Sequence, residues 1–387
     1  MNDRNRFPSW RVVSALILAA ALVTGCGNAS GDDGQSADDV FRVGFVNAEI
    51  GTPAFPDVSR AALAAASYLN DEEGGVGGRK LELVLCEVGT DAESNQACGH
   101  KFANDDDISL VILGTSINSG PLLAALGDKP VLGALPIGPS DFQAKNAVYY
   151  YGGAPSAQLG GAKFSASKGP KTIAYFYEDV AAGAEQAKIF ASGLDGTGIE
   201  LEQVAIPSGA TDVLPQVTKA KAVSADLVFV SVANCAPVAQ ALQTLGADGI
   251  FAAPSSCVTS KAIADSPALF EGWYILASST LQGTSDEARD LFEASFDKYT
   301  EGSTATPGAQ AEKGWGIVLS MAQALKGLSA EQLSDSAAVD EALRAFRGPV
   351  VVGTESIECP GAEPFPAVCS QTNLVYQVED AVPVPVG

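Results

Sequence analysis

The chain has 387 residues, of which 47% are hydrophobic and 18% charged, which allows a large core and favours two domains over one. Lys and Arg number 23 against 46 Asp and Glu, and the formal net charge of −23 argues against binding to nucleic acid or to anionic lipid headgroups. The single histidine, His100, excludes metal sites built from several histidines.

The first residues are typical of a secretory signal peptide. A basic start precedes an apolar run, Val12–Val23, that is too short to cross a bilayer comfortably. The ending Val23–Cys26 resembles the bacterial lipobox, in which the cysteine after the cleavage site carries diacylglycerol. We therefore predict that residues 1–25 are removed and that acylated Cys26 tethers the protein to a membrane without a spanning helix. Residues 26–40 are small, polar and acidic, as in a flexible tether.

From residue 41, nearly continuous apolar runs alternate with helical stretches. This pattern is typical of a parallel sheet that is covered on both faces by helices. The predicted strands are Phe41–Asn47, Leu81–Cys86, Ile108–Leu113 and Pro130–Leu135, and the predicted helices are Asp57–Asn70, Asp91–Asn104 and Ser119–Leu126.

The same alternation restarts after Gly152–Gly161. Two successive α/β sheets predict a doubly wound α/β architecture of two lobes with a cleft between them. The second set of predicted strands is Thr172–Tyr177, Ile199–Ala205, Asp226–Val232, Gly249–Ala253 and Trp273–Ala277, with helices over Ala182–Leu194, Asp212–Ala222 and Ala236–Leu245.

The last third of the chain is predicted to be helical, followed by a strand-like, proline-rich tail over Val350–Val386. Two of its helices begin at capping-box patterns, which are Thr284 with Glu287 and Ser329 with Gln332. The predicted helices are residues 284–299, Ala309–Leu325 with Trp315 on its buried face, and Glu331–Phe346.

Six cysteines remain after the lipobox cysteine. An even number in an exported chain favours disulfides, and no CxxC spacing indicates a zinc site. Six cysteines allow fifteen pairings. We predict the three sequence-local ones, Cys86–Cys98, Cys235–Cys257 and Cys359–Cys369.

The common catalytic motifs are missing. The sequence has no GxSxG elbow, Walker A loop, HExxH or DxDxDG loop, and the cluster Gly74–Gly78 precedes a strand, as a tight turn does. We predict neither a cofactor nor a metal. An enzymatic alternative, an exported serine-type hydrolase, would need His100 as the base for a nucleophile among Ser119, Ser255 and Ser256.

Loops that follow the strands are the candidate binding elements, because open α/β sheets bind ligands at the carboxyl ends of their strands. In the first lobe these loops are Asn47–Phe55, Gly114–Gly120 and Pro136–Phe142. The backbone N–H groups and hydroxyls of Gly114–Gly120 suit a small anion such as a carboxylate. Asn118 or Ser119 could equally cap the following helix, or do both.

One ordered series of short motifs resembles the type I periplasmic binding proteins, and more narrowly the branched-chain amino-acid-binding proteins of ABC importers. The likeness covers roughly residues 41–380, and it is carried by the order of the motifs rather than by any one of them. The matching residues are Val43-Gly44-Phe45, Gly51-Thr52, Ala61-Ala62, Leu69-Asn70, Gly74-Gly75-Val76-Gly77-Gly78-Arg79-Lys80-Leu81-Glu82-Leu83 and the terminal helix Gly314–Leu325.

The resemblance implies two Rossmann-like lobes joined by three hinge crossovers, near residues 152, 280 and 350. Lobe 1 would comprise residues 41–152 and 281–350, and lobe 2 residues 153–280 and 351–387. The matching binding positions are Phe55, Asn118, Ser119, Gly138 and Ser140 in lobe 1, and Ala182, Asn234 and Ser255 in lobe 2.

This sequence departs from the family pattern at three of its binding positions. Ser255 stands where amino-acid binders usually carry an acid for the ammonium group, Ala182 stands near the usual tyrosine, and Pro139 stands about where a threonine is expected. Other carboxylates could pair an ammonium group instead, and the candidates are Glu49, Asp141, Glu178 and Asp179.

The sequence therefore predicts a non-enzymatic, exported, lipid-anchored, monomeric binding protein. It would capture a small polar solute, such as an amino acid or a related amide or carboxylate, and deliver it to the permease and ATPase subunits of an ABC importer. The alternatives are the hydrolase described above and a ligand sensor that is not coupled to transport.

Overall fold

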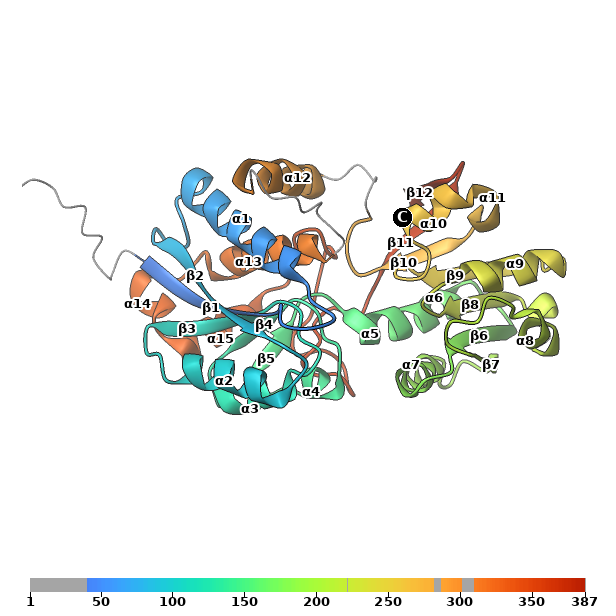
Figure 1. Ribbon diagram of the computed structural model, residues 1–387, viewed down its shortest axis with the longest axis horizontal. Helices are drawn as coiled ribbons and strands as arrows, with labels where there is room; N and C mark the ends of the chain where they lie inside the picture. The colour runs from blue at the N-terminus through green and yellow to red at the C-terminus, as the bar shows by residue number, and fades with distance from the viewer. Residues whose placement is uncertain (1–39, 221, 282–286, 301–309, 387) are drawn as a thin grey trace, which may run out of the picture. The chain divides into compact units, whose positions relative to one another are not determined.

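The computed structural model describes residues 40–220, 222–281, 287–300 and 310–386 (Figure 1). The predicted signal peptide, Cys26, nearly all of the predicted tether and the capping residue Thr284 lie outside the described residues. Within the described part of the chain, no helix combines the length and the hydropathy that crossing a membrane requires.

The first sheet has five parallel strands in the order β2-β1-β3-β4-β5. Every residue of β3 is buried, as expected for a central strand covered on both faces. Its elements are β1 (Val40–Ala48), α1 (Pro56–Glu72), β2 (Lys80–Val88), α2 (Ala92–Ala103), β3 (Ile108–Leu113), α3 (Gly120–Leu126), β4 (Val131–Gly133), α4 (Pro139–Phe142) and β5 (Ala147–Tyr149).

The second sheet has seven strands in the order β12-β11-β10-β9-β8-β6-β7. Its parallel part comprises α5 (Gly153–Pro155), a π-helical turn η2 (Ser156–Gly160), α6 (Gly161–Ser167), β6 (Thr172–Glu178), α7 (Ala181–Ser192), β7 (Glu200–Ile206), α8 (Leu214–Lys219), a 3₁₀ turn η3 (Ala222–Ser224), β8 (Leu227–Ser231), α9 (Ala236–Thr244), β9 (Ile250–Pro254), α10 (Ser260–Asp265), α11 (Pro267–Phe270) and β10 (Tyr274–Ala277). The hairpin β11 (Leu374–Glu379) and β12 (Val382–Pro385) extends it in the antiparallel sense. Two sheets built from βαβ units confirm the predicted fold class.

Four helices that lie between β10 and β11 in the sequence pack on the first sheet. They are α12 (Glu287–Tyr299), α13 (Ala311–Leu325), α14 (Ala330–Leu333) and α15 (Ser336–Ala345). In Figure 1, α13 runs beside α1, and an added Cβ on Gly314 would lie 2.2 Å from the Val58 carbonyl oxygen. The close approach of these two helices therefore depends on that glycine. Trp315 is fully buried, as expected.

The structure divides one predicted helix and contains one strand that was not predicted. The helix expected over Glu331–Phe346 is divided in two, because the Asp335 side chain accepts a hydrogen bond from the Ala337 N–H and starts α15 as a new helix. Beyond the crossover expected near residue 350, Val368 pairs with Tyr149 beside the first sheet. The short strand β5 was not predicted.

Each of the three expected cysteine pairs is joined in the structure. The Cα–Cα distances are 5.9 Å for Cys86–Cys98, 5.3 Å for Cys235–Cys257 and 4.7 Å for Cys359–Cys369. Cys235 and Cys257 follow β8 and β9, so their bond lies beside the ends of two neighbouring strands.

Removing the Cys235–Cys257 bond is expected to lower the free energy of unfolding by about 3 kcal/mol, because the unfolded chain regains the entropy of an open loop. The double variant Cys235→Ala/Cys257→Ala, compared with wild type by urea denaturation, measures this. Peptide mapping without reduction checks the connectivity, and free thiols at both positions in the wild-type protein would contradict the pairing.

Candidate functional site

A cavity of about 410 Å³, called here the central cavity, lies where residues that follow strands of both sheets come together. Leu135–Ile137 follow β4, Ser255 and Ser256 follow β9, and Ser278 follows β10. This is where open α/β sheets bind ligands. The other lining residues are Gly153, Ala154, Ala157, Gln158, Gln186, Ser231, Pro254, Thr259, Leu276, Gln310, Lys313 and Asn373.

The lining of the central cavity combines apolar side chains with neutral hydroxyl and amide groups. Lys313 is the one ionisable side chain among the described residues that line it. Such a lining suits a small solute with several hydrogen-bonding groups and a modest apolar part.

A buried chain of hydrogen bonds fixes one wall of the cavity. Tyr175 donates its hydroxyl to Gln158 Oε1 at 2.6 Å, and the Gln158 amide donates to Ser231 Oγ at 3.0 Å. Ser231 Oγ in turn lies 3.5 Å from Gln186 Oε1. Gln158 lies on the π-helical turn η2, a local geometry that is frequent at functional sites. The wall is therefore preorganised by hydrogen bonds among its own lining residues and by Tyr175, which lies outside the lining.

Lys313 belongs to a cluster of charged side chains at the start of α13. The Lys313 Nζ lies 3.3 Å from Ser279 Oγ and 3.8 Å from Glu312 Oε1. Lys313 is only 8% exposed. Glu312 is buried as well, accepts a hydrogen bond from Ser279 Oγ at 2.6 Å and forms a close ion pair with Arg289 of α12. Arg289 also donates to the Thr280 carbonyl at 3.0 Å. This cluster, Arg289–Glu312–Lys313–Ser279, connects α12 and α13 with the segment that leaves β10.

Burial lowers the pKa of Lys313, since desolvation penalises its charged form. The Glu312 carboxylate raises the pKa and the Arg289 guanidinium lowers it, both more weakly than burial. An anion in the central cavity would favour the protonated lysine.

The first-lobe residues expected to bind a ligand do not line the central cavity. Ser119 donates its hydroxyl to Asp141 in a short hydrogen bond, and Asn118 donates its amide to the Thr90 carbonyl at 3.1 Å. Neither side chain caps α3. Ser140 is exposed beside Gly120.

The other two expected first-lobe residues, Gly138 and Phe55, form hydrogen bonds through their backbone groups. The Gly138 N–H donates to Asp141 Oδ2 at 2.9 Å, and the Phe55 carbonyl accepts from the Asn47 amide at 2.9 Å. The Phe55 ring packs partly buried against the core.

The second-lobe residues divide between two cavities. Ser255 lines the central cavity. Ala182 lines a smaller one of about 200 Å³, which also contains Glu178 and shares Gln186, Ser231 and Ser256 with the central cavity. Asn234 lines neither, and its Oδ1 accepts from the Ala236 N–H at 3.1 Å at the start of α9.

Of the four acidic candidates for an ammonium group, three have partners elsewhere and none lines the central cavity. Buried Asp141 accepts from Ser119, from Tyr149 and from two backbone N–H groups. Glu49 accepts from Ser59 and Asn47, and Glu178 accepts from Ser208 Oγ at 2.8 Å. Asp179 is exposed.

Sequence reasoning missed Lys313, Gln158 and Asn373. A signal for Lys313 was present, because it is a lone cation on an otherwise largely apolar helix, where a charged residue is costly unless it has a partner. Gln158 and Asn373 gave none, since their positions depend on the crossover geometry around η2.

His100 is exposed on α2, lies 3.4 Å from the Gln96 amide and does not line the central cavity. The hydroxyls of Ser255 and Ser256 therefore have no histidine beside them. Among the described residues there is also no cluster of three or more His, Cys, Asp or Glu side chains that could hold a metal ion.

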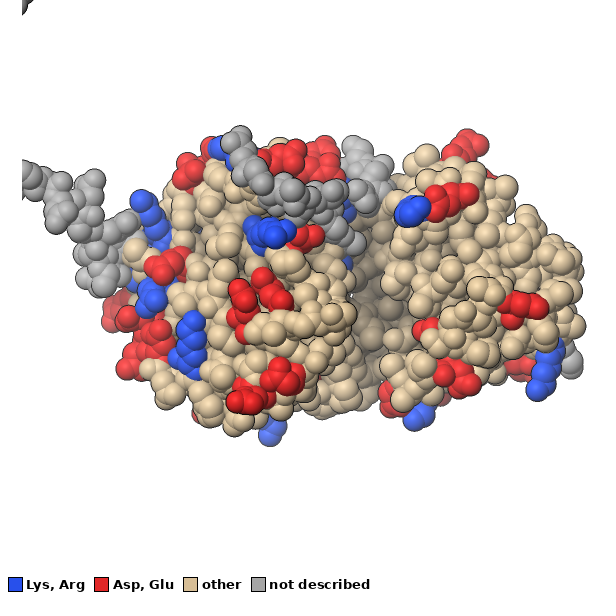
Figure 2. All heavy atoms as spheres, in the orientation of Figure 1, with Lys and Arg blue, Asp and Glu red and all other residues tan. Residues whose placement is uncertain are grey.

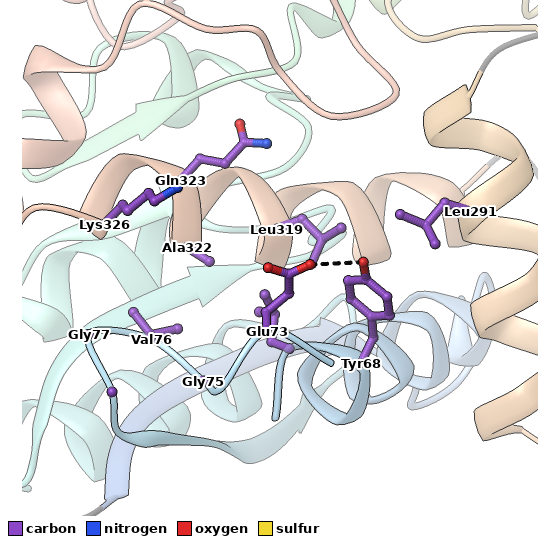
Figure 3. A pocket seen from close by; sticks show the side chains of 12 residues that line it. Tyr68, Glu73, Gly75, Val76, Gly77, Leu291, Leu319, Ala322, Gln323 and Lys326 are labelled. Atoms are coloured by element: carbon purple, nitrogen blue, oxygen red, sulfur yellow. Dashed lines mark hydrogen bonds between the residues drawn. The ribbon is translucent and has the colours of Figure 1, made fainter. Parts of the chain in front are cut away.

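A second cavity, of about 520 Å³, lies on the first-sheet part alone, between α1, the turn at Gly75–Gly78, α12 and α13 (Figure 3). The Tyr68 hydroxyl donates to Glu73 Oε1 at 3.2 Å across its floor, and Lys326 stands at its far end. No residue that follows a strand of the second sheet contributes to it. It therefore lacks the two-sided construction of the central cavity.

Known proteins resemble this chain in sequence and in fold. Residues 41–361 match a family model described as periplasmic binding protein. No curated protein sequence is significantly similar to the chain.

Solved structures share the fold over nearly its whole length. A proposed branched-chain amino acid ABC transporter protein of Rhodospirillum rubrum is 18% identical, with a TM-score of 0.75, and the match covers 90% of this chain and 100% of that one. An ABC transporter substrate-binding protein of Desulfitobacterium hafniense, solved with Leu, is 19% identical at a TM-score of 0.64, covering 90% and 100%. A solute-binding protein of Rhodopseudomonas palustris, solved with 3,4-dihydroxybenzoic acid, is 17% identical at 0.63, covering 90% and 97%.

Proposed function

Because the chain belongs to the periplasmic binding protein family, we propose that it is the extracytoplasmic substrate-binding protein of an ABC importer. It captures a small polar solute in the central cavity and delivers it to permease and ATPase subunits. The observation that carries the proposal is the cavity itself, lined by residues that follow strands of both sheets. Rotation of the two lobes about their crossovers would open and close such a site.

The structural neighbours support a solute site without identifying the solute. One of them was solved with leucine and another with a dihydroxybenzoic acid, so the shared fold accommodates different small molecules. In our proposal Ser255, Gln186 and Lys313 contact the solute, while Ser119 and Gly138 support the wall near Ile137 through Asp141.

A thermal-shift screen tests the proposal. The purified protein is heated with single amino acids, 2-hydroxy acids, small carboxylates, amides, polyols and urea. A bound solute raises the melting temperature, because it binds only the folded chain. Mass spectrometry of each stabilising solute after incubation should recover it unchanged. Failure of every solute to stabilise the protein counts against the proposed function, and conversion of a solute to product would favour the hydrolase.

The proposed anchor has its own test. In cells that express Cys26→Ser, the protein should be released or remain as the uncleaved precursor, because the thiol that carries the lipid is missing. Immunoblots of membrane and medium fractions measure this, with Cys86→Ser/Cys98→Ser as the control that leaves the lipobox intact. Fully processed, membrane-bound Cys26→Ser protein would refute the anchor.

A further inference from the structure

The charges around the central cavity are unusual for an amino-acid site. A free amino acid carries one carboxylate and one ammonium group, and each needs a partner when it is buried. Among the described residues that line the cavity, Lys313 offers a cation and none offers a carboxylate. Its other polar lining groups are hydroxyls and amides, such as those of Ser255, Ser278, Gln186 and Gln310.

The Lys313 Nζ lies 3.3 Å from Ser279 Oγ at the edge of the central cavity. The two carboxylate oxygens of the neighbouring Glu312 are already bonded to Ser279 and to Arg289. Lys313 is a more distant neighbour of that carboxylate, at 3.8 Å. Its side chain is nevertheless buried and lines the cavity, where it can donate to an anionic oxygen.

The two side chains expected to hold a carboxylate are engaged with other groups of the protein. Ser119 donates to Asp141, and Asn118 donates to Thr90. A solute carboxylate in the central cavity would therefore rely on a different donor, and Lys313 is the charged one within the described lining.

We infer that the central cavity takes a carboxylate that bears hydroxyl or amide groups and no ammonium group, with Lys313 as the partner of the carboxylate. This inference rests on the proposed function of the same cavity. A 2-hydroxy acid is the simplest member of the class, since its hydroxyl can donate to and accept from the neutral lining side chains.

The cost of burying an ammonium group explains the discrimination. An amino acid whose carboxylate faces Lys313 would bury its ammonium group among neutral side chains. Burying a charged group there costs more free energy than burying a hydroxyl. The nearest carboxylate to consider is Glu178, which lines the adjoining smaller cavity and accepts from Ser208. If Glu178 served an ammonium group, amino acids would bind better than hydroxy acids.

Matched solutes separate these two outcomes by isothermal titration. One set is L-leucine, (S)-2-hydroxy-4-methylpentanoate and the amide of that hydroxy acid, and the other is the corresponding phenylalanine series. The same sets join the thermal-shift screen. We expect the solutes that stabilise the protein to be carboxylates without an ammonium group. Within a set, the hydroxy acid should bind at least about tenfold more tightly than the amino acid or the amide.

Variants then assign the partner of the carboxylate. Lys313→Met should weaken binding of the best carboxylate by about ten- to a hundredfold, because a charge-assisted hydrogen bond is lost. Lys313→Arg should retain more of the affinity than Lys313→Met. Lys326→Met, at the C-cap of the same helix and outside the central cavity, is the matched control and should leave the affinity unchanged.

Each contrary result is distinguishable from failure of the proposed function. Preferred binding of amino acids, lost in Glu178→Gln, overturns the inference while the protein remains a solute-binding protein. Equal binding of the hydroxy acid and its amide does the same, and so does unchanged carboxylate affinity in Lys313→Met. Only a screen without any stabilising solute rejects the binding function itself.

Discussion

Replacing Glu312 by glutamine is expected to lower the free energy of unfolding by about 3–5 kcal/mol, because it leaves buried cations without their carboxylate. Glu312 is only 2% exposed, and it pairs with Arg289 and lies near Lys313, both also buried. Glutamine keeps the size of the side chain and can still accept from Ser279, so the loss measures the charge rather than the packing. Urea denaturation of the purified variant gives the value.

Glu293→Gln is the matched control. Glu293 Oε1 lies 3.5 Å from Nη1 of Arg289, whereas Glu312 contacts Nη2. The Glu293 side chain is 50% exposed. Exposed ion pairs contribute little, and we expect a loss below about 1 kcal/mol. Equal losses for the two variants would show that burial of the Arg289–Glu312 pair contributes nothing.

The Glu312→Gln variant should also change how stability depends on pH. Burial lowers the pKa of Lys313 in the folded chain, and Glu312 counteracts part of this shift, so the variant lowers the pKa further. Above that lowered pKa the folded chain has released the proton, while the unfolded chain keeps it up to a pH of about 10.4. The unfolded state then binds more protons, and stability rises with pH in this window. The rise should be larger in the variant than in the wild type.

Asp141→Ala is expected to be nearly as costly, at about 3–4 kcal/mol, since it removes the shared acceptor of four donors, two of them buried and two partly buried. Tyr149 donates to Asp141 at 2.6 Å and the N–H groups of Ile137 and Gly138 at 2.8 and 2.9 Å, and Ser119 donates in a short bond. Ile137 lines the central cavity, so solute affinity should fall along with stability.

Three comparisons test the role of Asp141 in urea denaturation. Asp141→Asn keeps one acceptor oxygen and should lose less than alanine. Ser119→Ala removes one donor and should cost about 1 kcal/mol. Asp128→Ala, at an exposed carboxylate between α3 and β4, should change stability by less than about 0.5 kcal/mol. A loss for Asp141→Ala no larger than that of Asp128→Ala would refute the structural role.

The sequence predicted the fold well because apolar runs mark parallel strands that are buried on both faces. The expected strand Ile108–Leu113 matches β3 residue for residue. The strand β5, with three residues between longer elements, carries too few positions for a periodicity to emerge. The pairing of Tyr149 with Val368 is non-local and leaves no local signal in the sequence.

The candidate site was harder to predict, and the reason is visible at Ser119. A serine after a buried strand has the same sequence context whether it meets a ligand, caps a helix or bonds another side chain. Only the fold brings Asp141 beside it. Ser255 lines the central cavity because it directly follows β9, a position that the strand pattern does define.

The charge of the whole chain gave no guide to the cavity either. On the face drawn in Figure 2, acidic side chains lie in several separate groups over the surface. The net charge of −23 concerns solubility, whereas solute choice depends on the few groups that line the cavity.

The order of the strands along the chain also constrains how the protein is made. Strand β11 pairs with β10 at the far side of the second sheet, but residues 278–373 separate the two strands in the sequence. The helices that cover the first sheet, α12–α15, likewise follow the whole parallel part of the second. Neither sheet, with the helices that cover it, is therefore complete when only the residues up to β10 have been synthesised. Until β11 emerges from the ribosome, β10 presents an unpaired edge, the kind of surface that recruits other unfolded chains.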